Sequence, residues 1–154
     1  MLIPISFYTI LAVYIKILPQ MLIWLFFFLF YRNLIGGYHA DSHIKCIFFS
    51  SIYGLTAIYS IQLLSCINLY LQIITLFLLF IIHILTKPII HHLDDDSPEY
   101  IRKYRIKIFI FFVISCVLIL ICNSPMTSIS TAIFTGLISA EILYVIACFK
   151  HRYN

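Results

Sequence analysis

Long apolar runs separated by short polar segments make up most of this chain. No Asp, Glu, Lys or Arg occurs in residues 46–86 or in residues 108–140, which are runs of 41 and 33 residues. A helix needs about 20 apolar residues to cross a bilayer, so each run is long enough for two membrane spans. Polar segments at 65–68 and 123–125 are where we expect the two runs to divide, the second because proline cannot continue a helix.

The first 31 residues carry one charge, Lys16, which Pro19 follows closely. We interpret this region as two short spans, with one long tilted helix as the alternative. Backbone polar groups in lipid must be satisfied within their own segment, which favours helices over open strands. The sequence therefore predicts an all-α polytopic membrane protein, one domain over 1–154, with six spans near 2–17, 20–35, 44–64, 69–86, 108–122 and 127–147.

Composition and charge agree with a membrane protein. The chain is 63% hydrophobic and 10% charged, whereas soluble domains carry about 25% charged residues. The net charge of +4 is scattered between apolar runs, so we expect no nucleic-acid partner. With six spans, only Lys16 lies on one side, and the positive-inside rule makes the other side cytoplasmic. That side would hold both termini and Arg32, Lys45, Lys87, Arg102, Lys103, Arg105, Lys107, Lys150 and Arg152.

The N-terminus and the cysteines set two further expectations. Residues 1–4 lack the basic region of a secretory signal peptide, so we expect none to be removed. The five cysteines are odd in number and show no paired spacing, which argues against a disulfide framework.

A polar island from Arg32 to Cys46 differs from the rest of the chain. It contains a diglycine, two histidines, an aspartate and a cysteine at the ends of two predicted spans. Gly36 and Gly37 allow a sharp backbone turn. A thiol peptidase needs a thiolate and a base, and an imidazolium or a helix N-terminus favours the thiolate.

His39 and Cys46 are the candidate pair in this island. On one straight helix their seven-residue spacing places them on one face but about 10 Å apart along the axis, too far for proton transfer. The pair therefore requires that 36–42 is not continuous helix. His43, three residues before the cysteine, is a competing base, and Asp41 is a candidate to orient His39. Two alternatives stay open: an ordinary interfacial loop, and a zinc site of both histidines and the cysteine that lacks a fourth ligand.

Other polar residues give weaker signals. The run His91–Asp96 is interpreted as a solvated loop, and Cys148 with His151 lacks a turn that would join them. His83 and Glu141 fall within or near the ends of spans, where ionisable residues are functional candidates. Residue spacing names no partner for Glu141.

The island resembles the signature of the accessory gene regulator B (AgrB) family, through Arg32, Gly36, Gly37, His39 and Cys46. A weaker likeness lies at 87–107, where a Lys-Pro pair, a Ser-Pro-Glu segment and a basic stretch are similar to the loop after the family's fourth span. The motif stands earlier in this chain than in most members, so the resemblance implies a shortened N-terminus without the usual amphipathic segment.

The resemblance implies a bacterial plasma-membrane cysteine endopeptidase of quorum sensing. Such enzymes cut an AgrD-like propeptide near its C-terminus and help to form the cyclic autoinducing peptide. Cys46 would be the nucleophile and His39 the base, on the cytoplasmic side, with Arg32, Gly36, Gly37 and Asp41 in support. We expect no cofactor and no metal; the expected partners are the propeptide, the bilayer and a second copy in a homodimer.

Three other functions are alternatives to the cysteine endopeptidase hypothesis. A small transporter or exporter subunit would carry polar residues deep in several spans, or broken helices in matched halves, and the chain shows few of either. A non-catalytic scaffold leaves the island without a purpose. A metal-dependent membrane enzyme would be inhibited by chelators.

Overall fold

The computed structural model describes residues 9–35, 43–63, 68–85, 98–122 and 129–153, with side chains except at 43–51, 83–85, 98, 100 and 149–153. All regular structure in these ranges is helical. A short helix at 9–14 is followed by α2 (Leu18–Ile35), α3 (His43–Leu63), α4 (Leu69–Leu85), α5 (Pro98–Ile121) and α6 (Ile129–Tyr153). The predicted six-helix, all-α architecture is confirmed.

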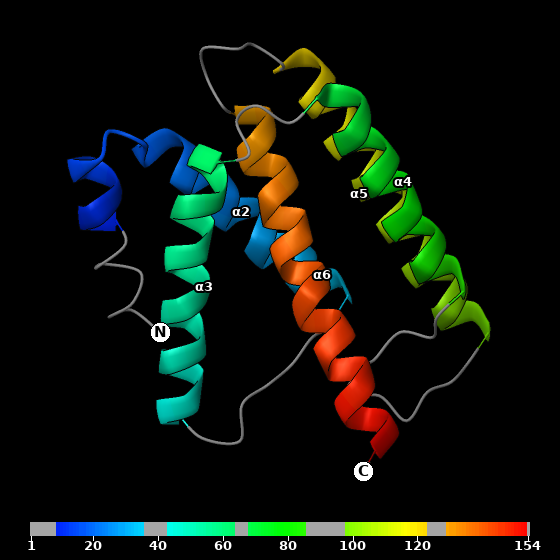
Figure 1. Ribbon diagram of the computed structural model, residues 1–154. Helices are drawn as coiled ribbons and strands as arrows, with labels where there is room; N and C mark the ends of the chain where they lie inside the picture. The colour runs from blue at the N-terminus through cyan, green and yellow to red at the C-terminus, as the bar shows by residue number, and fades with distance from the viewer. Residues whose placement is uncertain (1–8, 36–42, 64–67, 86–97, 123–128, 154) are drawn as a thin grey trace.

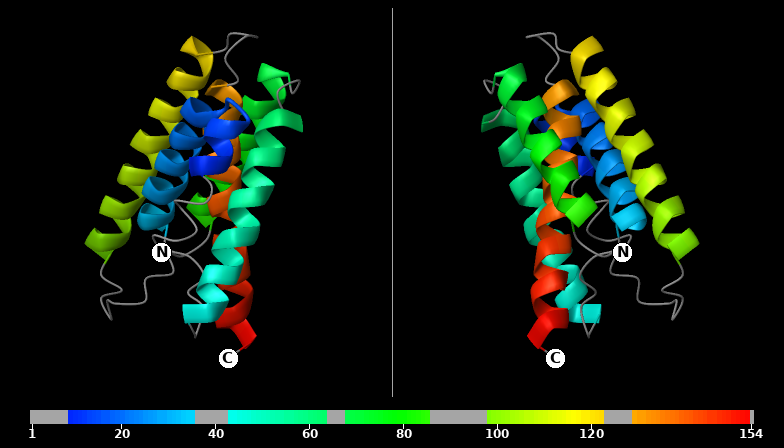
Figure 2. Two further views of the ribbon diagram at one scale, coloured as in Figure 1. Left: turned by 90° about the vertical axis from the view of Figure 1, so that its left-hand side faces the viewer. Right: turned by 90° about the vertical axis from the view of Figure 1, so that its right-hand side faces the viewer.

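Successive helices from α2 to α6 run in alternating directions, as expected of a chain that crosses a bilayer repeatedly (Figures 1 and 2). Among the described residues, α2 and α6 make the most extensive contact and form a parallel central pair. α3 packs against this pair on one side and α5 on the other, while α4 packs mainly against α5. The core therefore centres on α2 and α6.

The chain breaks between the 9–14 helix and α2, as Lys16 and Pro19 led us to expect. Lys16 has a left-handed φ of 62°, and the Ile17 N–H donates to the Ala12 carbonyl at 2.9 Å. These are the features of a Schellman motif, which satisfies the last carbonyls of a helix and turns the chain. One long tilted helix through 2–35, the alternative for this region, is thereby excluded.

The other two predicted divisions also coincide with helix ends. α3 ends at Leu63 and α4 begins at Leu69, where the Asn68 side-chain oxygen accepts a hydrogen bond from the Tyr70 N–H at 3.1 Å. Asparagine is a favoured N-cap because it satisfies one such free donor. α5 ends and α6 begins on either side of the proline segment at 123–125.

The start of α5 was predicted wrongly. The uncharged run suggested 108, with 87–107 as a loop, but the helix begins at Pro98. Proline suits the first helical position because its missing N–H would be unpaired there. Glu99 then pairs with Lys103 at 2.8 Å on the exposed surface. Counting apolar residues detects only the part of a helix inside lipid, and α6, which runs to Tyr153, extends past its prediction for the same reason.

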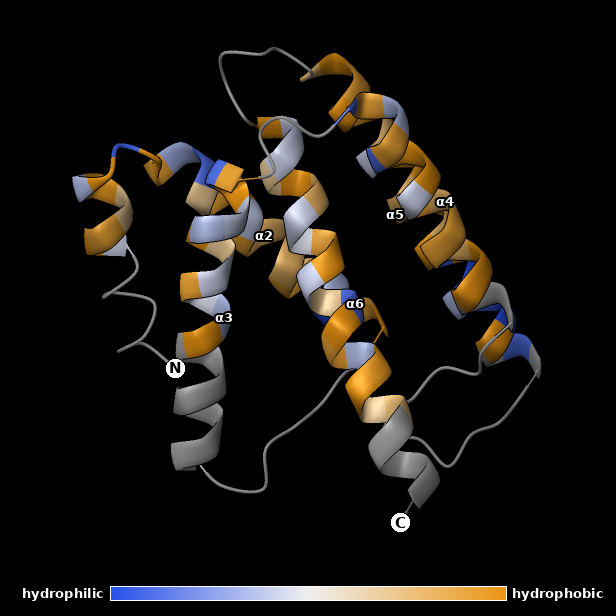
Figure 3. Ribbon diagram, viewed as in Figure 1, coloured by the Kyte–Doolittle hydropathy of each residue, from blue (hydrophilic) through white to orange (hydrophobic). Residues whose placement is uncertain are grey.

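The outer surfaces of the helices are strongly apolar (Figure 3). On α5 the outward positions are large hydrophobic residues with about half of their surface exposed, including Phe109, Val113 and Leu120. Three helical stretches are long and apolar enough to cross a membrane, namely Leu18–Ile35, Ile101–Ile121 and Ile129–Cys148, and two apolar stretches are shorter, Ile52–Leu63 and Leu69–Ile82. Lipid is the solvent that such a surface requires, so this is a polytopic membrane protein.

Small residues allow α2 and α6 to approach closely. Ala132, Gly136 and Ala140 recur every fourth residue on α6, and all three are buried. A Cβ added at Gly136 would lie 2.9 Å from the Trp24 backbone oxygen and 3.3 Å from the Phe27 Cβ. This is the small-residue spacing by which membrane helices pack backbone against backbone.

Aromatic rings fill the adjoining space between α2 and α5. Phe27, Phe30 and Tyr31 of α2 surround Phe111 of α5, with ring centroids 5.1 to 5.9 Å from its ring. Pairs at these separations contribute beyond the area that they bury. These rings hold α2 against α5 while Phe27 and Tyr31 also contact α6.

Gly136→Ala should destabilise the protein, because the added methyl group meets a backbone oxygen that cannot move without separating the helices. Overpacking of this kind costs about 1–3 kcal/mol. The free energy of unfolding in detergent micelles would measure it. Val145→Ile is the matched control, since it adds one methyl group to the same helix at a position that is 37% exposed. Equal stability of the two variants would contradict the close contact.

Candidate functional site

The polar island spans the end of α2, the connection to α3 and the start of α3. α2 ends at Ile35 and α3 begins at His43, and the two helices run in opposite directions (Figures 1 and 2). One unbroken helix through 35–46 is therefore excluded, which removes the arrangement that would have kept the candidate base and nucleophile two turns apart. The separation of the two groups remains a prediction, because Gly36, Gly37, His39 and Asp41 lie outside the described residues.

Position 46 is the fourth residue of α3. The N–H groups of a first turn lack intrahelical acceptors, and together with the helix dipole they favour a negative charge there. The backbone of α3 at this position therefore favours an anionic group. The zinc alternative stays untested at this place, because the side chains of His39, His43 and Cys46 are not described. Elsewhere in the described part of the chain, no three His, Cys, Asp or Glu residues gather as a metal site.

Arg32 lies in the last turn of α2 and is partly buried. Its guanidinium lies in the neighbourhood of the Tyr53 side chain on α3. Phe28, one turn earlier on α2, stacks on the Tyr53 ring with centroids 6.4 Å apart. These contacts join the end of α2 to α3 beside the polar island, which is the structural role that a supporting arginine would have.

Glu141 has a partner that residue spacing did not reveal. The Tyr31 hydroxyl of α2 donates to Glu141 Oε2 of α6 at 3.1 Å, and the two residues are 0% and 3% exposed. Tyr104 and Tyr144 lie in the neighbourhood of Tyr31. A carboxyl group within a membrane needs such partners. Tyr31 immediately precedes Arg32, so this bond fixes the end of α2 that leads into the polar island.

The structure describes the lesser candidates only in part. His83 and His151 lie in helices, but their side chains are not described, and the run at 91–96 lies outside the described residues. Cys148, near the end of α6, is a half-buried free thiol. Cys116 and Cys122, also free and partly buried, belong to the α5 region instead.

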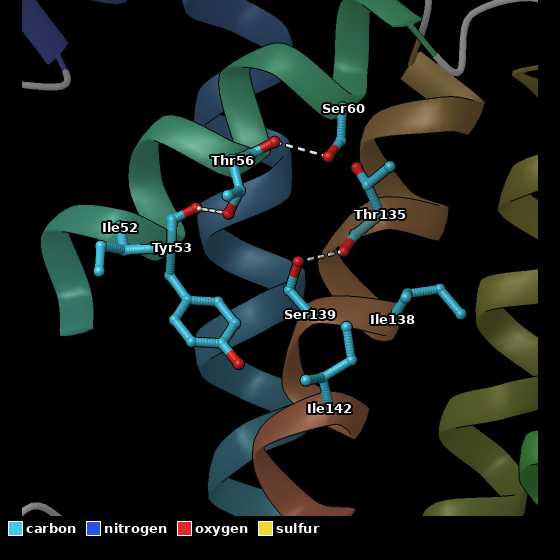
Figure 4. Close-up of a pocket in the computed structure, with 8 residues that line it drawn as sticks. All are labelled: Ile52, Tyr53, Thr56, Ser60, Thr135, Ile138, Ser139 and Ile142. Carbon is cyan, nitrogen blue, oxygen red and sulfur yellow. Dashed lines mark hydrogen bonds between the residues drawn. The ribbon is translucent and has the colours of Figure 1, made fainter.

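A groove between α3 and α6 was missed by the sequence analysis. It has a volume of about 360 Å³, and hydroxyl groups from both helices line it (Figure 4). A signal for it was available, because Ser and Thr recur every fourth residue on both helices, but no pattern tells which two such faces will meet. The lining residues are Ile52, Tyr53, Thr56 and Ser60 of α3 with Thr135, Ile138, Ser139 and Ile142 of α6.

Positive charges gather at the end of the bundle that carries the polar island. Arg32 at the end of α2, Lys45 at the start of α3 and the exposed basic residues at the start of α5 lie there, as does the end of α6 (Figures 1 and 2). The turn between the 9–14 helix and α2, which contains Lys16, lies at the opposite end. The described helix ends thus show the charge asymmetry that the sequence predicted.

One comparison with known proteins gives a match. The sequence model of a family described as accessory gene regulator B matches residues 1–149, which include the whole polar island. No curated protein and no solved structure matches the chain significantly.

Tyr31→Phe should lower the free energy of unfolding by about 1–3 kcal/mol, because it removes a hydrogen-bond donor from a buried carboxyl group. Tyr59→Phe is the matched control, since Tyr59 is 66% exposed. Denaturation in micelles, followed by tryptophan fluorescence, would measure both. If Tyr31→Phe is no less stable than Tyr59→Phe, the Tyr31–Glu141 bond contributes nothing to the fold.

Proposed function

This chain belongs to the AgrB family of membrane cysteine endopeptidases, which process the precursors of autoinducing peptides in quorum sensing, and we propose that Cys46 and His39 perform its reaction on the cytoplasmic side of the membrane. The family match carries this proposal, because the matched region contains Arg32, Gly37, His39 and Cys46, which resemble the family signature. The reversal of the chain between α2 and α3 supports it.

The cleavage step begins with proton transfer from the Cys46 thiol to the His39 imidazole. The thiolate adds to the scissile carbonyl carbon of the propeptide, and the carbonyl oxygen becomes an oxyanion. Backbone N–H groups at the start of α3 are candidate donors to that oxyanion. The tetrahedral intermediate then collapses: the C–N bond breaks, the imidazolium returns its proton to the leaving amine, and an acyl-enzyme thioester remains on Cys46.

Ring closure follows from the thioester without any other reactant. A Cys or Ser side chain within the bound peptide loses its proton to the imidazole and attacks the thioester carbonyl. The C–S bond to Cys46 breaks, the sulfur regains the proton, and a thiolactone or lactone is released. For a thiolactone the exchange is nearly balanced in free energy, so the yield depends on keeping water from the thioester. A site at the membrane boundary suits this need.

The supporting residues act on the geometry of the loop. Arg32 lies at the end of α2 near Tyr53 and supports that end, Gly36 and Gly37 allow the chain to turn, and Asp41 orients the imidazole of His39. None of these roles requires a metal or a cofactor.

Cys46→Ala should abolish cleavage of the AgrD propeptide, with a loss of about 10³-fold or more, because no other group can form the thioester. His39→Ala should lose activity to a similar degree. Propeptide cleavage in isolated membranes, followed by mass spectrometry, would measure both variants.

Cys122→Ala is the matched control for the loss of a thiol, since Cys122 follows α5 at the opposite end of the bundle from the polar island. It should cleave at the wild-type rate. Normal cleavage by Cys46→Ala would rule out Cys46 as the nucleophile.

The orientation is tested by labelling intact cells with a membrane-impermeant maleimide, in a chain whose native cysteines are replaced by serine. Lys103→Cys, exposed near the start of α5, should be labelled only after the cells are permeabilised. Lys16→Cys, at the opposite end, should be labelled on intact cells. The reverse pattern would place the polar island outside the cell.

A further inference from the structure

We propose that the groove between α3 and α6 binds the part of the propeptide that lies three to six residues from the scissile bond. The groove would contact the apolar side chains of this segment and accept hydrogen bonds from its backbone N–H groups. This inference rests on the proposed function, because it takes Cys46 as the nucleophile. It adds a substrate-binding surface within the membrane-spanning part of the protein.

The register of α3 connects the groove to the nucleophile. Tyr53 and Ser60 follow position 46 by seven and fourteen residues, so all three positions share nearly one face of the helix. At 1.5 Å per residue, they lie about 10 and 21 Å from position 46 along the axis. An extended peptide covers about 3.3–3.6 Å per residue. The groove therefore begins about three residues from the scissile bond and ends about six residues from it.

The two walls of the groove carry hydroxyl groups that have unused acceptor capacity. On α3, Thr56 donates to the Tyr53 carbonyl at 2.9 Å and Ser60 to the Thr56 carbonyl at 2.5 Å. On α6, Thr135 donates to the Thr131 carbonyl at 2.8 Å and Ser139 to the Thr135 carbonyl at 2.7 Å. A hydroxyl has one donor and two acceptor sites. Each of these oxygens can therefore still accept a hydrogen bond from a molecule in the groove.

This chemistry favours a peptide over a lipid chain as the occupant. An extended peptide that enters the membrane must satisfy its backbone N–H groups, and leaving one unpaired in an apolar medium is costly. Hydroxyl acceptors on both walls meet that need. An acyl chain has no donor and gains nothing from them. Ile52, Ile138 and Ile142 supply apolar contacts for side chains, and the volume of about 360 Å³ falls within the range of ligand pockets, roughly 300–1,000 Å³.

The end of the groove nearest to position 46 is also the part that α2 supports. Tyr53 is held there by the Phe28 ring, and Arg32 lies nearby. The groove is therefore positioned by the same helix end that leads into the polar island. A peptide could lie in the groove and reach the nucleophile without a change in the helix packing.

Photocrosslinking tests the occupant directly. Benzoylphenylalanine replaces Thr56, an exposed residue of the groove, in the Cys46→Ala variant, and radiolabelled AgrD propeptide is added to the membranes. The matched control places the same probe at Leu55, which is 49% exposed and does not line the groove. We expect a crosslink to the propeptide from position 56, at least fivefold stronger than from position 55.

The other crosslinking outcomes overturn the inference. The first is a crosslink from position 56 to lipid only. The second is a crosslinked product of twice the mass of the chain, which would identify a second copy as the occupant. The third is equal crosslinking to the propeptide from positions 55 and 56. Failure of the proposed function would be separate and visible, because the propeptide would then be cleaved even though Cys46 is absent.

A kinetic test uses Ser139→Phe, which fills the groove from the α6 side. Cleavage of the AgrD propeptide, as kcat/KM, should fall at least tenfold, while labelling of Cys46 by iodoacetamide stays within twofold of wild type. Val145→Phe adds the same ring on the lipid-facing side of α6 and should cleave normally. If Ser139→Phe does not accumulate in the membrane, Thr56→Leu at the exposed edge replaces it. Unchanged cleavage by the accumulated groove variant overturns the inference.

Discussion

The close contact of α2 with α6 is the constraint on which the other features depend. It is possible because Gly136 has no side chain to hold the helices apart, and a methyl group there would meet the Trp24 backbone at 2.9 Å. Further along the same pair, the Tyr31–Glu141 hydrogen bond fixes the helix register. Arg32 follows Tyr31 directly, so its position beside Tyr53 is a consequence of this packing. Helix packing in the core thus determines where the polar island begins.

Most of the helix boundaries could be predicted from the sequence, because the thickness of the bilayer limits how long an apolar helix can be. The breaks at Lys16, at Asn68 and near 123–125 were all identified by residues that end or begin helices. The start of α5 was not, since a helix that leaves the membrane keeps its own hydrogen bonds and needs no apolar residues. The boundary error is therefore confined to the aqueous ends of helices.

The candidate site also has some features that could be predicted from the sequence and others that could not. The polar island could be recognised because its residues are neighbours in the sequence and their types suggest thiol chemistry. The Tyr31–Glu141 bond joins residues 110 positions apart, and the groove needs two hydroxyl-bearing faces to meet. Serine and threonine positions are weak indicators of such a contact, because their hydroxyl groups often bond only to the backbone of their own helix. Such features depend on how helices pack, which apolar patterns in a membrane protein hardly specify, since most faces are apolar.

A thioester intermediate makes the location of the groove chemically useful. In the proposed reaction, hydrolysis and ring closure would compete for the same carbonyl, and the enzyme would favour the ring by holding the peptide folded near the sulfur while limiting water. A peptide whose neighbouring residues lie between α3 and α6 would be anchored in a part of the protein that lipid surrounds. Its hydrogen bonds to Thr56 and Ser139 would cost little in that place, because those oxygens already lie in the membrane with acceptor sites to spare. Binding and the exclusion of water would then have one physical origin, the placement of a largely apolar groove with a few hydroxyl acceptors inside an apolar solvent.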